Sequence, residues 1–280
     1  MLVAVLALGF AACGGDDDEP EAPAGGSSGS AASGLPESEA ISKIQDAGKL
    51  RVGVAVALPW LGQDPESEEY FGPATLIAES AAEKLGVELE YVPETFDTIV
   101  ASIQADKIDI ANAALYATEE RKKVIDMVDW SIGGYCYLAK KDSPLTTTDQ
   151  INSPDVTMAN FVGTGTYETT KAAYPEVKQV TRTAAAGEAV NAPEVESGQA
   201  DVTPFDAALA QVYAERYPDL KVFPEDCFEN PDLPTPVAAG LPKGDAGFTQ
   251  FMTDLVAELQ PQLDEQFAKF ATPEYLEQSG

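Results

Sequence analysis

The residues best suited to binding chemistry are Thr118–Arg121, which follow an apolar, strand-like run from Ile108 to Leu115. Thr118 precedes two acidic residues, a pattern typical of a helix N-cap and its first turn. The start of a helix offers free backbone N–H groups, and the planar fork of Arg121 matches a carboxylate. The stretch therefore predicts a socket for a small anion. Its competing interpretation is a solvated surface arginine paired with Glu119 or Asp126.

The elements that must position this socket alternate between strands and helices. Apolar runs at 49–58, 87–91 and 108–115 indicate strands, and patterned segments at 36–48, 75–85 and 96–104 indicate helices. Strands that alternate with helices through short connections predict a parallel α/β sheet. Further along, we expect strands at 132–140, 156–161, 221–223 and 237–241, and helices at 187–196, 207–216 and 247–270.

The composition limits the classes of function. The chain has 280 residues, a formal net charge of −30 and no histidine. Nucleic-acid binding needs a basic face, so this acidity argues against it. The absence of histidine disfavours histidine-based catalysis and most transition-metal sites. We therefore predict no metal, no cofactor and no nucleic-acid partner.

The N-terminal residues indicate an exported protein. Residues 1–12 are apolar but too few to span a bilayer, which predicts a signal peptide. Cys13 follows two alanines and resembles a lipoprotein processing site. The acidic, Gly/Ser-rich segment after it predicts a disordered tether over 13–36 that a lipid on Cys13 would anchor. The alternative is an ordinary signal peptide with a free cysteine.

The order D-I-x7-T-x2-R-x4-D-x2-D-W-S, from Asp109 to Ser131, resembles the polar amino acid-binding family of extracytoplasmic solute-binding proteins of ABC transporters. The resemblance extends from about Leu50 to Tyr275. It implies an α/β, two-lobed periplasmic-binding-protein-like fold of type II, in which each lobe has a central β-sheet flanked by helices. Lobe 1 would comprise 37–138 and 238–280, lobe 2 would comprise 139–237, and two crossover strands would form the hinge.

The same resemblance implies how a ligand is held. Arg121 in lobe 1 and the loop with Thr164, Gly165 and Thr166 would bind a carboxylate, with the register of the threonines left open. Asp206 ends a G-x2-D-x4-D pattern, where the family places the carboxylate that holds the ammonium group. Asp206 could also be the cap of the helix that follows it.

The resemblance further implies a pocket wall made of aromatic and small residues. Trp60, Phe96 and Tyr116 are its aromatic candidates, joined by Ala114 and Thr118. Trp60 and Phe96 are equally compatible with ordinary core positions. The apolar segment 54–57 stands where family members that bind basic amino acids often carry an acid, which disfavours lysine or arginine as the ligand.

Two cysteines remain once Cys13 is assigned to lipid. In an exported domain, Cys136 and Cys227 suggest one disulfide, and both lie near the predicted crossover strands. A pair of buried thiols is the alternative.

The resulting functional prediction is a non-enzymatic, membrane-anchored, extracytoplasmic lipoprotein. It would be a monomer that captures an α-amino acid or related zwitterion and delivers it to an ABC permease. Two alternatives stay open: a dehydratase-like enzyme of the same fold, with Glu168 as the nearest candidate base, or a solute sensor or adhesin without transport.

Overall fold

The computed structural model describes residues 34–183 and 190–276, and residues 36–280 form one compact unit. The predicted signal peptide, the lipidation site Cys13 and nearly all of the predicted tether lie outside the described residues. None of the described helices combines the length and apolarity that crossing a membrane requires.

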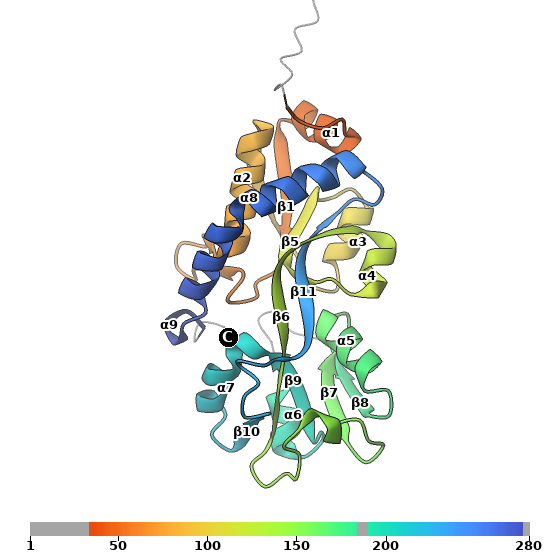
Figure 1. Cartoon of the computed structure of the whole chain (residues 1–280), viewed down its shortest axis with the longest axis vertical. Helices are drawn as coiled ribbons and strands as arrows, with labels where there is room; N and C mark the ends of the chain where they lie inside the picture. The colour runs from red at the N-terminus through yellow and green to blue at the C-terminus, as the bar shows by residue number, and fades with distance from the viewer. Residues whose placement is uncertain (1–33, 184–189, 277–280) are drawn as a thin grey trace, which may run out of the picture. The chain divides into compact units, whose positions relative to one another are not determined.

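The first lobe is built from the strand–helix alternation that the sequence predicts (Figure 1). The parallel strands run in the order β4-β1-β5. Ser38 caps the first helix by accepting a hydrogen bond from the Ile41 N–H. The elements are α1 (Glu39–Ala47), β1 (Lys49–Val54), β2 (Gly62–Gln63), β3 (Tyr70–Phe71), α2 (Pro73–Leu85), β4 (Glu88–Pro93), α3 (Ile99–Gln104), β5 (Ile110–Tyr116) and α4 (Glu119–Val124).

Two long antiparallel strands, β6 (Asp126–Lys140) and β11 (Asp232–Leu241), run from one lobe to the other (Figure 1). Near its start β6 pairs with β11, and from Tyr135 onward it pairs with β9 of the second lobe. The predicted start of this strand at 132 is wrong, because the ladder already begins at Asp126. The predicted lobe boundaries fall inside β6 and β11 and remain a proposal.

The second lobe continues the same sheet through β9, β7 and β8, while β10 pairs with the far end of β6. Strand β8 was not predicted, and α6 begins at Ala192 rather than at 187, with Pro193 in its first turn, where proline fits a helix. The elements are η1 (Thr148–Gln150), β7 (Thr157–Phe161), α5 (Gly165–Ala173), β8 (Lys178–Arg182), α6 (Ala192–Ser197), β9 (Val202–Asp206), η2 (Ala207–Leu209), α7 (Ala210–Arg216) and β10 (Leu220–Phe223).

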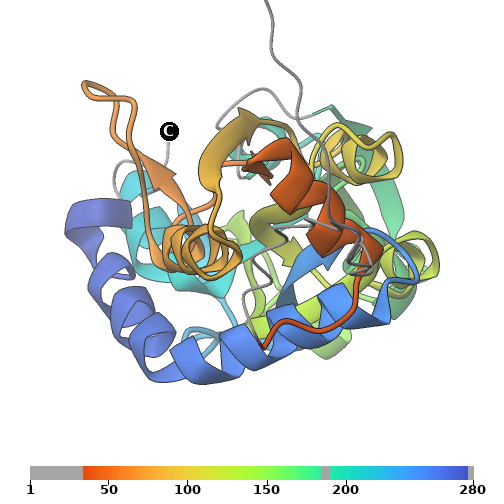
Figure 2. The ribbon, with the colours of Figure 1, turned by 90° about the horizontal axis from the view of Figure 1, so that it is seen from above.

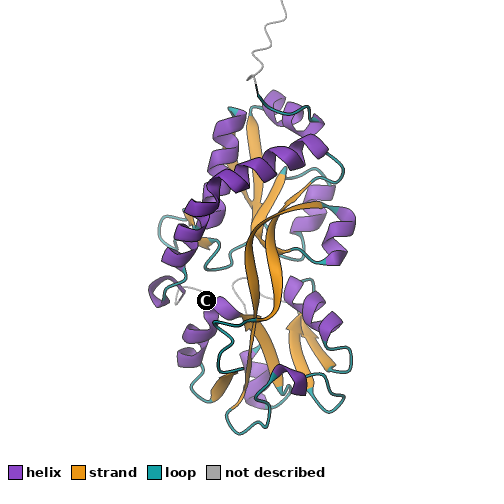
Figure 3. Ribbon diagram, in the orientation of Figure 1, coloured by secondary structure: helices purple, strands orange, loops and turns teal. Residues whose placement is uncertain are grey.

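Helices lie outside the strands in both lobes (Figure 3). The chain ends in α8 (Ala246–Phe270) and α9 (Pro273–Leu276), and α8 runs along the outside of the first lobe (Figure 2). The buried face of α8 packs on α2 and β6. The apolar core of the second lobe also includes Leu58 from the first lobe and Leu276 from α9.

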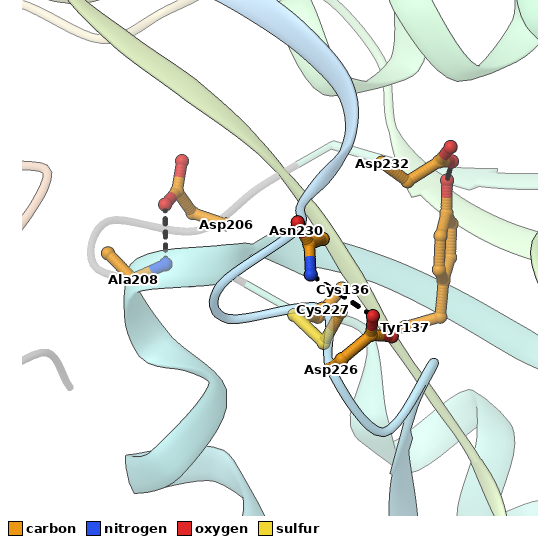
Figure 4. The surroundings of a disulfide bond; sticks show 8 residues. All are labelled: Cys136, Tyr137, Asp206, Ala208, Asp226, Cys227, Asn230 and Asp232. Carbon is orange, nitrogen blue, oxygen red and sulfur yellow. Dashed lines mark hydrogen bonds between the residues drawn. A yellow bond between two sulfur atoms is a disulfide. The ribbon is translucent and has the colours of Figure 1, made fainter.

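A disulfide joins Cys136 of β6 to Cys227, in the loop between β10 and β11 (Figure 4). Both cysteines are buried. The predicted bond is therefore present, and it fastens the segment that leads into β11 to the strand that enters the second lobe.

Candidate functional site

The site begins where β5 ends. Every residue of β5 is buried, and Ala114 adopts a positive φ of 49°, an uncommon conformation for a residue with a side chain. Thr118 then caps α4, because its hydroxyl accepts a hydrogen bond from the Arg121 N–H at 3.3 Å. The cap predicted from the sequence is confirmed, and it fixes the direction in which the arginine leaves the helix.

Arg121 is buried, with 5% of its surface exposed. Its Nη1 donates to the Tyr116 carbonyl at 3.0 Å and its Nη2 to the Gly163 carbonyl at 3.5 Å. Within the described residues no carboxylate lies within 4 Å of the guanidinium, so the interpretation as a surface ion pair with Glu119 or Asp126 is wrong. Burial lowers the pKa of Arg121, and the negative charge of Glu168 opposes that shift.

The loop before α5 brings the second lobe against this arginine. The Thr164 hydroxyl caps α5 by accepting from the Tyr167 N–H at 3.1 Å, and it donates to the Phe161 carbonyl at 2.8 Å. A Cβ on Gly165 would lie 3.3 Å from Nη1 of Arg121. The first turn of α5 therefore lies beside the guanidinium, and the positive end of the helix dipole adds to a positive environment.

Asp206 ends β9 in the second lobe and is partly buried. It accepts a hydrogen bond from the Ala208 N–H at 3.0 Å (Figure 4) and another from the hydroxyl of Tyr116 in the first lobe. Burial raises the pKa of Asp206 to about 7, although both hydrogen bonds act to lower it. In the described part of the chain, no cationic side chain lies within 4 Å of this carboxylate.

Two aromatic candidates, Trp60 and Phe96, make their recorded contacts with residues of the first lobe and of α8. The Trp60 indole N–H donates to the Ser131 hydroxyl at 3.2 Å, and its ring packs against Phe267 of α8. Phe96 packs on the apolar cluster of the first lobe. The structure thus brings Arg121, Tyr116, Thr118, Gly165 and Asp206 together, with Thr164 capping the adjoining helix. Ala114 lies two residues before Tyr116, and the Thr166 carbonyl accepts from Thr170 in α5.

The sequence did not predict how closely Gly133 and Glu168 approach Tyr116 and Thr118 at the end of β5. The Thr118 hydroxyl donates to Oε2 of Glu168 at 2.6 Å, and a Cβ on Gly133 would come within 2.5 Å of the Tyr116 hydroxyl oxygen. A glycine inside the crossover strand is a signal for such an approach. Clusters of three or more metal-ligating side chains are absent among the described residues.

The sequence matches the family described as bacterial extracellular solute-binding proteins, family 3, over residues 50–272. The chain belongs to this family. This solute-binding protein is similar to the glutamine-binding protein of Geobacillus stearothermophilus. The two sequences are 30% identical over 196 residues, which cover 68% of this chain and 73% of the relative. The family is extracellular, in agreement with the exported protein that the sequence predicts.

Solved structures of solute-binding proteins share the fold. The ancestral amino acid-binding protein AncCDT-1, a precursor of cyclohexadienyl dehydratase, has a TM-score of 0.66 and 27% identity, and covers 83% of this chain and 99% of its own. The arginine-bound form of a truncated ArgBP from T. maritima has a TM-score of 0.63 and 26% identity, and the match covers 78% of this chain and 99% of the truncated one. The two-lobed type II fold predicted from the sequence is confirmed, and these relatives are described as binding proteins.

Proposed function

We propose that this solute-binding protein captures an α-amino acid, or a closely related zwitterion, between its two lobes. One observation carries the proposal. A buried guanidinium in the first lobe and a partly buried carboxylate in the second, Arg121 and Asp206, each lack an ionic partner among the described residues. Buried charges without partners are costly, so such groups are retained where a ligand completes them.

A free amino acid supplies both missing charges. Its carboxylate pairs with Arg121 and with the N–H groups at the start of α5, and its ammonium group pairs with Asp206. Because the two protein charges come from different lobes, one ligand engages both when the lobes are together. Hydrogen bonds to charged groups contribute about 1.5–3 kcal/mol each, so loss of either charge should weaken binding by roughly 10- to 150-fold.

Binding rather than catalysis fits the residues at the site. The dehydratase alternative needs a base and a second catalytic group, and Glu168, its nearest candidate, is engaged by Thr118. The named relatives are binding proteins, of glutamine, of arginine and, for AncCDT-1, of amino acids. Measurement of turnover with carboxylated ring substrates, alongside binding, separates the two functions.

The remaining parts of the proposal concern the cell. We infer that Cys13 carries a lipid that anchors the chain outside the membrane, and that the ligand-bound monomer delivers its cargo to an ABC permease. These steps rest on the N-terminal sequence and on the family. Metabolic labelling with a radioactive fatty acid, compared between wild type and Cys13→Ala, tests the anchor.

A thermal-shift screen over the twenty amino acids tests the binding function. We expect at least one to raise the melting temperature of the wild type, and Arg121→Met and Asp206→Asn to lose that rise. Arg182→Met is the matched control, because Arg182 already pairs with Glu194 at 2.6 Å and should keep the ligand response. Equal ligand-induced shifts in all four proteins would refute the roles proposed for Arg121 and Asp206.

A further inference from the structure

Polar side chains at the site join the two lobes directly. Tyr116, at the end of β5 in the first lobe, donates its hydroxyl to Oδ2 of Asp206 in the second. Thr118, two residues later, donates its hydroxyl to Oε2 of Glu168 in α5 at 2.6 Å. Both hydrogen bonds therefore run from the first lobe to the second, and both are made by the protein alone.

The first bond engages a group that the proposed ligand would use, and the second places a carboxylate in the surroundings of Arg121. Oδ1 of Asp206 accepts from the Ala208 N–H, and the Tyr116 hydroxyl hydrogen occupies Oδ2, the oxygen left for an ammonium group. Glu168 is linked to Arg121 through Thr118, whose hydroxyl accepts from the Arg121 backbone N–H at 3.3 Å and donates to Glu168 at 2.6 Å. Its negative charge opposes the lowering of the pKa of Arg121. A hydroxyl hydrogen thus stands at the ammonium acceptor, and a carboxylate stands near the guanidinium.

The backbone around Tyr116 leaves room for the ring in this position. A Cβ on Gly133 would lie 2.5 Å from the tyrosine oxygen, and a Cβ on Gly165 would lie 2.7 Å from Cβ of Tyr116. The ring of Tyr135 meets it edge-on, with a centroid separation of 5.3 Å. Since almost any side chain at either glycine would displace the ring, the hydroxyl is aimed at Asp206 by the packing around it.

We propose that Tyr116 and Glu168 are internal substitutes for the two ends of the ligand, and that they latch the lobes together when no ligand is bound. The identity of the ligand rests on the function proposed above, whereas the latch is a property of the ligand-free chain. The incoming ammonium group displaces the tyrosine hydroxyl, and the incoming carboxylate takes the place of Glu168 near Arg121.

Spin-label distance measurements on the full chain without ligand test the latch. Labels are attached through a ketone-bearing amino acid at two exposed positions, Glu83 of α2 and Lys178 of β8, which leaves the cysteines untouched. The wild type is compared with the double variant Tyr116→Phe/Glu168→Ala. The matched control is Tyr174→Phe, which removes a tyrosine–aspartate hydrogen bond outside the site.

We expect a short, narrow distance distribution for the wild type and for the control, and a longer, broader one for the double variant. Equal distributions for wild type and double variant, or a long distribution in the wild type itself, would overturn the latch. If the double variant does not fold, Tyr116→Phe alone must lengthen the distance. Calorimetry with L-glutamine and L-arginine tests ligand binding separately. If neither amino acid binds, the proposed ligand class is refuted, and the distance distributions still decide whether the latch exists.

Discussion

Binding of a zwitterion at this site should weaken as the pH falls through 7. Burial raises the pKa of Asp206 to about 7, and the protonated form offers no charge to an ammonium group. Well below that value, each further pH unit therefore costs about a factor of ten in affinity. Between pH 8 and pH 5, we expect the dissociation constant to rise roughly 90-fold, because Asp206 changes from mostly ionised to almost fully protonated.

Isothermal titration calorimetry between pH 5 and 8 measures this dependence. The ligand is the amino acid that gives the largest thermal shift, and at pH 7 two buffers of different ionisation enthalpy report the protons released on binding. Asp206→Asn should bind weakly at every pH, with no slope from this group. Asp232→Asn is the control, because Asp232 also accepts a tyrosine hydroxyl but lies outside the site (Figure 4). A flat profile in the wild type would refute the reasoning.

Two further changes follow from the packing. Gly165→Ala should weaken ligand binding at least tenfold with the fold intact, because the new methyl group would lie 2.7 Å from Cβ of Tyr116. Calorimetry measures the affinity, and an unchanged circular dichroism spectrum shows that the fold is intact. An unchanged affinity would contradict the prediction. Replacement of Cys136 and Cys227 by serine should reduce the free energy of unfolding by about 2–5 kcal/mol in urea titrations, since the bond closes a long loop of chain, 91 residues apart in sequence. An unchanged urea midpoint would count against that role.

Local patterns in the sequence were sufficient for most of the first lobe. The apolar run that becomes β5 and the threonine that caps α4 both act over a few residues, so their types and spacing predict them. Strand β8 was missed because its sequence, Lys178–Arg182, is polar and partly exposed and lacks an apolar stripe. The early start of β6 was missed because its first residues are mixed in polarity, and their partner β11 lies about a hundred residues away.

The site likewise has features that local sequence predicts and features that depend on contacts between distant residues. The position of Arg121 at the start of a helix is local and could be predicted, as could the cap formed by Asp206. The bond between Tyr116 and Asp206 joins residues 90 positions apart, and it depends on how the two lobes meet. A sequence pattern carries no information on that approach, apart from the glycine at 133.

A crystal structure of the complex with the amino acid that the screen identifies tests the central claim most directly. We predict the ligand carboxylate within hydrogen-bonding distance of the Arg121 guanidinium, and the ligand ammonium within that distance of an Asp206 oxygen. A ligand bound with neither contact, or bound outside the space between the lobes, would contradict the account.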